Sequence, residues 1–214
     1  MRIVKFKPFL KVLILYFVSI FFIYYLVNEI LNVDKLVIDD LNLKFTKDQI
    51  FKYMEFKNNW FFLSYVFSIF YFVIKVTIIS SFLYIYIHLF TDLDVRFKKI
   101  QILVIKSEFI FLLVPIFKLF YFLFIYSNYK LEDFQNFYPF SALQIIGYNI
   151  DKWWIYPLQT INLFELGYCL LLANYIGKET NTNSDEGLKI VGFSYVPVLF
   201  LWIVLLMFLT LNLT

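Results

Sequence analysis

Four polar residues interrupt long apolar stretches of this sequence, where ionisable and amide side chains are rare. They are Lys75, Lys118, Asn162 and Glu165. A charge near the centre of a bilayer costs about 2.5–3.5 kcal/mol on insertion scales, so each such residue needs a partner or a purpose. A carboxylate among lysines and amides can form an ion pair, bind an ion or line a polar path. We take these four residues as the candidate site, an intramembrane polar cluster.

Glu165 is the natural ion-pair partner for Lys75 or Lys118, because it is the one acid that we expect near the bilayer centre. Glu108 is expected near the end of its helix, where a long side chain can reach the lipid headgroups. Three alternatives remain for the cluster: a structural ion pair, a path for a substrate or ion, or an unpaired group that becomes neutral. The sequence does not choose which lysine pairs with Glu165.

Helical spacing predicts that these polar residues face the protein interior. Lys75 shares one helix face with three other polar side chains, namely Ser64, Ser68 and Tyr71. Gln159, Asn162 and Glu165 recur every three residues and predict a polar stripe on a neighbouring helix. Pro115 lacks a backbone N–H and is expected to kink the helix that carries Lys118.

The sequence lacks the motifs of common membrane enzymes. It contains no H-E-x-x-H zinc helix, no G-x-S-x-G elbow, no P-loop and no pair of aspartates within an apolar stretch. The single histidine, His88, excludes a two-histidine metal site within one chain, and the single cysteine, Cys169, excludes an internal disulfide. We therefore expect no enzymatic activity and no cofactor.

The composition places these residues in a membrane protein. Of 214 residues, 62% are hydrophobic and 16% are charged, against about 45–50% and about 25% in soluble domains. Apolar stretches long enough to cross a hydrocarbon core of about 30 Å cover roughly residues 8–27, 60–90, 102–126, 155–176 and 190–213. The sequence therefore predicts an all-α fold, a polytopic membrane helix bundle of about five transmembrane helices forming a single domain over residues 1–214.

Two longer connections, 29–59 and 128–152, are predicted to contain short amphipathic segments that lie in the membrane interface. Thr46-Lys-Asp-Gln49 and Ser141-Ala-Leu-Gln144 have the form of helix capping boxes. Two interpretations remain for these segments. They either anchor and pack the bundle or form a lid over a cavity in the membrane.

Basic residues suggest the orientation in the membrane. Arg2, Lys5 and Lys7 precede the first span, and the short loop after the second contains Arg96, Lys98 and Lys99. The positive-inside rule then predicts a cytoplasmic N-terminus and an external C-terminus in a bacterial cytoplasmic (inner) membrane. The net charge of +3 is attributed to this bias, so nucleic acid is not an expected partner. The expected partners are the lipid bilayer and other membrane proteins, and the sequence leaves open whether the protein forms a homo-oligomer.

Residues 161–177, INLFELGYCLLLANYIG, resemble a stretch of the Yip1-like family of five-span membrane proteins. Two similar proline-bearing segments, around Pro115 and Pro197, flank it as in that family. The resemblance covers about residues 98–211. It implies five spans with a cytoplasmic N-terminus and a non-enzymatic protein that acts through partners, since eukaryotic relatives serve membrane traffic.

We therefore expect a membrane scaffold or accessory subunit of a larger complex, in protein export or membrane trafficking. The alternative is a small transporter or channel subunit whose polar path is lined by the second, third and fourth helices. A cavity that connects Lys75 and Glu165 to water would favour transport. A dry, paired core together with a co-purifying membrane protein would favour the scaffold.

Overall fold

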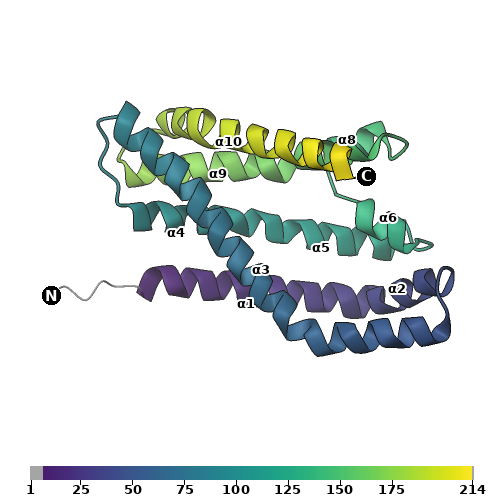
Figure 1. Cartoon of the computed structure of the whole chain (residues 1–214). Coiled ribbons are helices and arrows are strands. Elements are labelled where there is room, and N and C mark those ends of the chain that lie inside the picture. Colours follow the sequence, from purple (N-terminus) through teal and green to yellow (C-terminus); the bar gives the residue numbers. More distant parts are fainter. Residues whose placement is uncertain (1–6, 214) are drawn as a thin grey trace.

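The computed structural model describes residues 7–213, and in this range the predicted all-α fold is confirmed, with helices and no strand (Figure 1). The helices follow in chain order as α1 (Lys7–Leu31), α2 (Val33–Asn42), α3 (Lys47–Phe90), α4 (Phe97–Glu108), the 3-10 turn η1 (Phe109–Leu112), α5 (Leu113–Phe120), the π-helical turn η2 (Tyr121–Ile125), α6 (Leu131–Asn136), α7 (Ala142–Ile146), α8 (Lys152–Thr160), α9 (Leu163–Glu179) and α10 (Ser184–Leu213).

Four helical stretches are long and apolar enough to cross a membrane. They are Pro8–Leu31, Lys47–Phe90, Phe97–Ile125 and Ser184–Asn212. The remaining predicted span, 155–176, is not one helix, because the chain breaks between α8 and α9. At 17 residues, α9 is about 25 Å long. The structure thus supports a membrane protein with four candidate spans, and the count of five is not confirmed.

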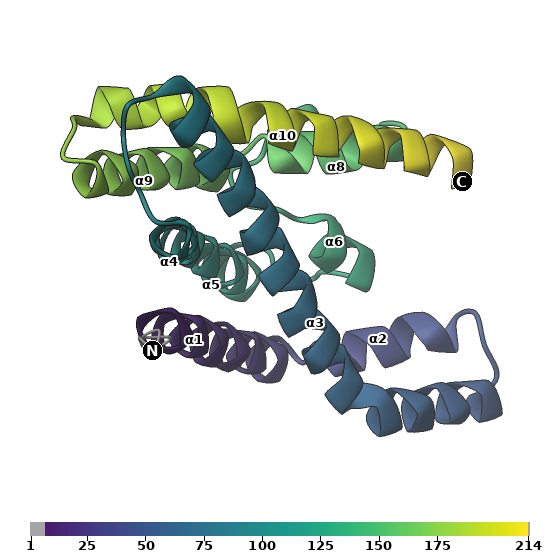
Figure 2. The same cartoon turned by 60° about the vertical axis from the view of Figure 1, so that its left-hand side comes forward.

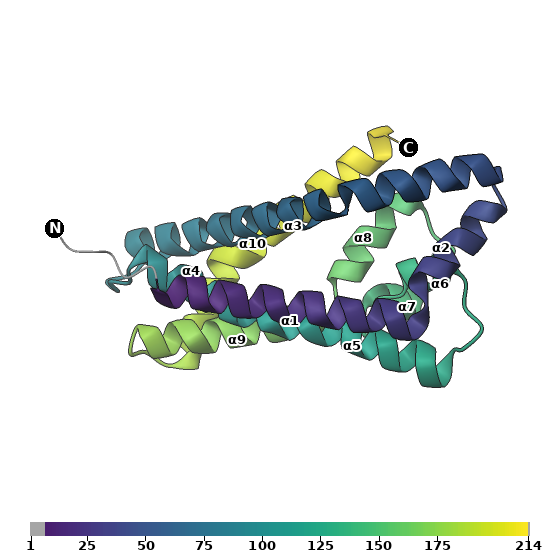
Figure 3. The ribbon, with the colours of Figure 1, turned by 90° about the horizontal axis from the view of Figure 1, so that it is seen from below.

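In Figure 1, the long helices α1, α4, α5, α9 and α10 run roughly side by side, and α3 crosses them obliquely. Five helix ends lie together at one end of the bundle, which we call the shared end (Figures 1 and 3). They are the start of α1, the end of α3, the start of α4, the end of α9 and the start of α10. The C-terminal end of α10 lies at the opposite end. Residues at equal distances from the shared end therefore meet at the same depth.

The N-terminal part of α3 leaves the bundle together with α2 and forms an arm (Figure 2). With 44 residues, α3 is about 66 Å long, more than twice a hydrocarbon core of about 30 Å. The predicted capping box begins it, since the Thr46 N–H donates to Gln49 Oε1 over 3.0 Å. The Asp34 carboxylate holds α2 in place by accepting from Lys57 Nζ at 2.7 Å and from Asn28 Nδ2 at 3.1 Å.

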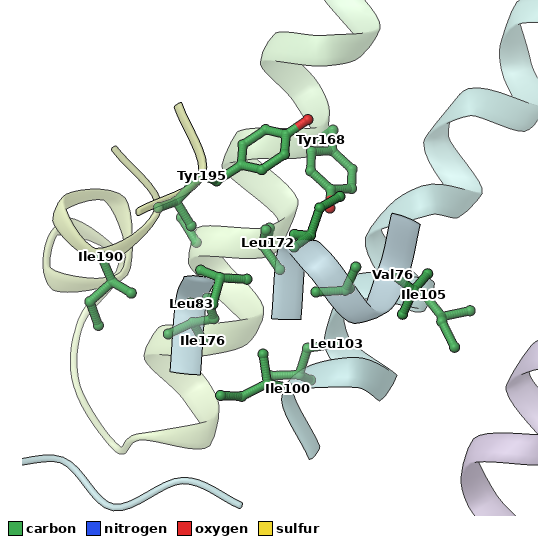
Figure 4. Close-up of a cluster of buried hydrophobic side chains, with 14 of the residues drawn as sticks. Val76, Leu83, Ile100, Leu103, Ile105, Tyr168, Leu172, Ile176, Ile190 and Tyr195 are labelled. Carbon is green, nitrogen blue, oxygen red and sulfur yellow. The ribbon is translucent and has the colours of Figure 1, made fainter. Parts of the chain in front are cut away.

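The hydrophobic core lies where α3, α4, α9 and α10 meet (Figure 4). Its fully buried side chains are aliphatic and come from all four helices, for example Leu83, Ile100, Leu172 and Ile190. The backbones of α9 and α10 approach closely at Gly187, where a Cβ atom would lie 2.0 Å from the Ala173 carbonyl oxygen. Glycine is therefore required there, and this packing fixes the first turns of α10 against α9.

Candidate functional site

A cavity of about 590 Å³ lies between α1, α3, α8, α9, α10 and the continuous stretch formed by α4, η1 and α5. Its polar lining comes from Lys75, Glu108, Gln159, Asn162, Glu165 and Tyr195. Four of the lining residues stand eleven to fifteen residues from the shared end of the bundle, namely Lys75, Glu108, Glu165 and Tyr195. This separation corresponds to roughly 16–23 Å along a helix. That distance is about half to three quarters of the thickness of a hydrocarbon core of about 30 Å.

Lys75 and Glu108 form a close ion pair on one wall of this cavity. The Lys75 ammonium lies 2.8 Å from both Glu108 carboxylate oxygens, and its hydrogen bond goes to Oε2. The Glu108 side chain is 2% exposed, whereas 34% of the Lys75 side chain is accessible. The same ammonium lies 5.2 Å from the centroid of the Phe111 ring. Lys75 thus neutralises a carboxylate that is sealed behind it.

The predicted pairing of Glu165 with Lys75 or Lys118 is not what the structure shows. Neither lysine forms an ion pair with Glu165 in residues 7–213. The expectation for Glu108 was also wrong, because α4 begins at Phe97 and carries this carboxylate more than two turns deeper than a headgroup position. Because α3 and α4 are consecutive and pack against each other beyond the 91–96 connection, residues a few turns to either side of it can meet. That proximity along the chain is the sequence signal for the Lys75–Glu108 pair.

Asn162 stands at the break between α8 and α9 and joins the two helix ends. Its Oδ1 accepts from the Glu165 N–H at 2.8 Å and so caps α9. Its Nδ2 donates to the carbonyls of Gln159 and Thr160 at 2.8 and 2.9 Å, which are among the last carbonyls of α8. Every polar atom of this side chain is used to hold the break, and none is left over for a solute.

A neighbouring loop satisfies the backbone of the break. The Ala142 N–H donates to the Ile161 carbonyl at 2.8 Å, and the Leu163 N–H donates to the Phe140 carbonyl at 3.2 Å. Phe140 has a φ of 56°, a left-handed conformation that costs a non-glycine residue about 1 kcal/mol or more. Gln144 Oε1 stabilises it by accepting the Phe140 N–H at 3.0 Å. The second predicted amphipathic segment, α7, therefore braces the break from outside.

Glu165 occupies the first turn of α9 and lines the cavity. The Tyr195 hydroxyl on α10 donates to its Oε1. Within residues 7–213, this is the one side-chain hydrogen bond that Glu165 accepts, so Oε2 has no donor there. The positive end of a helix dipole also favours a negative charge in a first turn. The cavity thus contains a carboxylate that forms no ion pair within the described chain, although the Lys75 ammonium on the same lining attracts it from a longer distance.

Tyr138, in the loop between α6 and α7, also lines the cavity. Burial, and to a smaller extent the negative charge of Glu165, raise the pKa of the Tyr138 hydroxyl. The hydroxyl therefore stays protonated at neutral pH. It can present a neutral aromatic ring and a hydrogen-bond donor to the cavity.

Lys118 lies apart from the other predicted site residues. It does not line the cavity, and its ammonium sits 4.2 Å from the centroid of the Phe134 ring on α6. A cation over an aromatic face is a stabilising arrangement in a desolvated place. The structure therefore brings together Lys75, Asn162 and Glu165, adds Glu108, Gln159, Tyr138 and Tyr195 to them, and leaves Lys118 outside.

No known protein family, curated protein or solved structure matches this chain. The resemblance to Yip1-like proteins consequently stays a prediction. Among the described residues, no group of three or more His, Cys, Asp or Glu side chains could hold a metal ion. The cavity offers instead two carboxylates, one ammonium, amides and aromatic hydroxyls.

Proposed function

We propose that this protein is a small membrane transport protein, or the transport subunit of a larger assembly, that holds a polar solute between its helices. The observation that carries the proposal is the cavity of about 590 Å³ that Lys75, Glu108 and Glu165 line together. Its volume falls within the roughly 300–1,000 Å³ of small-molecule sites. Polar groups that only stabilised a fold would be expected to pack without room for a solute.

The break between α8 and α9 supports the same proposal. Irregular backbone at membrane depth is tolerated where protein buries it or where it lines a polar cavity. Transporters often place the ends of broken helices at midplane binding sites. Here the first turn of α9 carries Glu165 to the cavity, and the last turn of α8 brings Gln159 and Thr160 there.

We further propose that α9 crosses the membrane as a short fourth span, which gives five crossings in all. The run of α9 back along the bundle toward the start of α10 supports this count (Figure 1). The N-terminus is then cytoplasmic and the C-terminus external, in the cytoplasmic membrane of a bacterium, as the distribution of lysine and arginine predicts.

The arm formed by α2 and the N-terminal part of α3 favours a second candidate, an accessory subunit that binds another membrane protein. The arm extends beyond the bundle (Figure 2) and exposes large aromatic side chains, namely Phe51, Phe56, Trp60, Phe61 and Phe62. Exposed aromatic residues in such numbers are typical of protein or membrane contacts. This is also the role that the resemblance to Yip1-like proteins implies.

Cysteine accessibility tests the transport proposal, because Cys169 is the one native cysteine. In a Cys169→Ser background, new cysteines are placed in the cavity with Thr160→Cys and Val198→Cys. Matched controls are Leu172→Cys in the sealed core and Ile85→Cys on the outer face of α3. A membrane-impermeant methanethiosulfonate reagent is applied to each face of proteoliposomes.

We expect the cavity cysteines to react and both controls to stay unmodified, because this reagent reacts with thiolates in contact with water. Reaction from one face or from both would support a water-connected cavity. Unreactive cavity cysteines on both faces would contradict transport and favour the accessory subunit.

A further inference from the structure

The charges of the cavity do not balance. Its lining contains two carboxylates, Glu108 and Glu165, and one cation, Lys75. The Lys75 ammonium lies 2.8 Å from both carboxylate oxygens of Glu108, so this ion pair has no net charge. Glu165 is left with a tyrosine hydroxyl as its hydrogen-bond donor. With all three groups ionised, the cavity carries one excess negative charge in a place of low dielectric constant.

We propose that the cavity binds a small organic ammonium ion, with Glu165 as its counter-ion and the surrounding aromatic rings as its walls. This inference rests on the proposed transport function and names the substrate class of the same cavity. An anion is disfavoured by the net negative charge, because like charges repel strongly where water is scarce. A neutral solute gives no reason for a buried carboxylate that forms no direct ion pair and shares Lys75 with Glu108.

The walls of the cavity favour an organic cation over a metal ion. Rings from five elements line it, among them Tyr24, Tyr71, Tyr138, Tyr156 and Trp202. The faces of such rings attract ammonium groups, and aromatic cages recognise alkylated ammonium ions in this way. A metal ion would need several oxygen ligands, whereas the described residues offer no group of three acids, histidines or cysteines.

Hydrogen-bond acceptors are available at the same place for an ammonium that carries N–H groups. Glu165 Oε2 accepts no hydrogen bond within the described chain. Gln159 donates through Nε2 to the Asn136 carbonyl at 3.1 Å. The Oε1 atom of Gln159 accepts no hydrogen bond within the described chain and is a second available acceptor. The Trp202 indole donates to the Tyr156 hydroxyl at 2.9 Å and thereby fixes two of the aromatic walls. The cavity therefore suits both alkylated and primary ammonium ions.

The test uses purified full-length protein in nanodiscs and isothermal titration with three probes. Choline chloride is the alkylated ammonium, and butylammonium chloride is the primary one. The uncharged isostere of choline, 3,3-dimethylbutan-1-ol, has the same shape without the charge. We expect saturable binding of at least one ammonium ion, and binding of the isostere at least tenfold weaker than that of choline. Equal affinity for choline and the isostere, or no binding of either ammonium ion, would overturn the inference.

Glu165→Gln removes the counter-ion and is expected to weaken ammonium binding at least tenfold. Glu179→Gln, at the opposite end of the same helix and outside the cavity, is the control and should bind like the wild type, since it removes only an ion pair with Lys99. Should Glu165→Gln fail to fold, Tyr138→Phe and Tyr138→Leu form a second pair. Tyr138→Phe keeps the aromatic ring and should keep the affinity for the ammonium ion. Tyr138→Leu loses the ring, and its affinity should fall at least threefold. Unchanged affinity in Glu165→Gln or in Tyr138→Leu would argue against the site.

The failure of this inference can be told apart from the failure of the proposed function. If the cavity cysteines react with the water-borne reagent but no ammonium ion binds, the cavity is open to solvent and the substrate class is wrong. If the cysteines do not react and no ammonium ion binds, the transport proposal fails together with this inference.

Discussion

Glu108 is the residue that most changes the interpretation of the intramembrane charges. It is 2% exposed and is compensated by Lys75 alone among the described cations. Breaking such a pair leaves a buried charge without compensation, which costs far more than the pair itself contributes. The two residues should therefore behave as a unit, so that removing one of them alone destabilises the protein more than removing both.

The first prediction concerns this pair. Lys75→Met should lower the free energy of unfolding by about 3 kcal/mol, the lower end of the range for buried pairs, because a third of the Lys75 side chain is accessible. The double variant Lys75→Met with Glu108→Gln should recover most of that loss. The measurement is unfolding by SDS titration from mixed micelles, with Lys106→Met, an exposed lysine of α4, as the control. A double variant less stable than Lys75→Met would contradict the pairing.

At the scale of elements, Asp34 joins α2 to two other helices. The hydrogen bond from Lys57, followed by that from Asn28, lowers the pKa of the Asp34 carboxyl below its ordinary value of 3.8. A depressed pKa in the folded state stabilises the fold at pH values above the ordinary pKa. The stabilisation is lost as the pH falls through 3.8 and then through the lower folded value. The arm should therefore loosen in acid.

The second prediction is that the protection factors of the α2 amides, which are corrected for the intrinsic slowing of exchange in acid, fall between pH 6 and pH 3. More than half of the Asp34 side chain is exposed, so the change should stay small and confined to the arm. Asp34→Asn lacks the titrating group and should show no such extra change. Equal behaviour of the two proteins would show that the carboxylate does not hold α2.

The third prediction uses two glycines of α10 as a matched pair. A Cβ on Gly187 would lie 2.0 Å from a backbone oxygen of α9, while one on Gly192 would meet nothing within 4 Å. Gly187→Ala should therefore destabilise the protein by about 3 kcal/mol through overpacking. Gly192→Ala should be neutral or stabilise it by up to about 1 kcal/mol through helix propensity. Thermal unfolding in detergent measures both, and equal effects would mean that α9 and α10 are not packed this closely.

At the scale of the whole molecule, the two ends of the described chain lie at opposite ends of the bundle (Figure 3). The fourth prediction follows from this arrangement together with a membrane-spanning α9. Reporters fused before α1 and after α10 should appear on opposite faces of the membrane, the first in the cytoplasm. Reporters on the same face would mean that α9 does not cross and that the number of crossings is even.

The amino-acid sequence by itself determined the helical character of the protein and its longest apolar helices, which are long enough to cross a membrane. Long runs of apolar residues leave few alternatives to helices in lipid, because every backbone group must be hydrogen-bonded within its own segment. The same reasoning anticipated the capping box before α3, and Lys75, Asn162 and Glu165 line one cavity. These features are local, and local spacing is sufficient to predict them. The inward position predicted for Ser64, Ser68 and Tyr71 on the face of Lys75 was wrong, because all three are exposed where α3 leaves the bundle.

The tertiary structure decided which charges meet. A three-residue repeat suggested one continuous polar helix around Asn162, but hydrogen bonds from the distant segment 140–142 allow the chain to break there. Charge complementarity suggested that Glu165 pairs with a lysine. In the structure, the packing of α3 against α4 brings Lys75 to Glu108, and Lys118 lies over the Phe134 ring of α6. Partner choice depends on depth, crossing angle and helix ends, and these quantities are set by contacts between segments far apart in the chain.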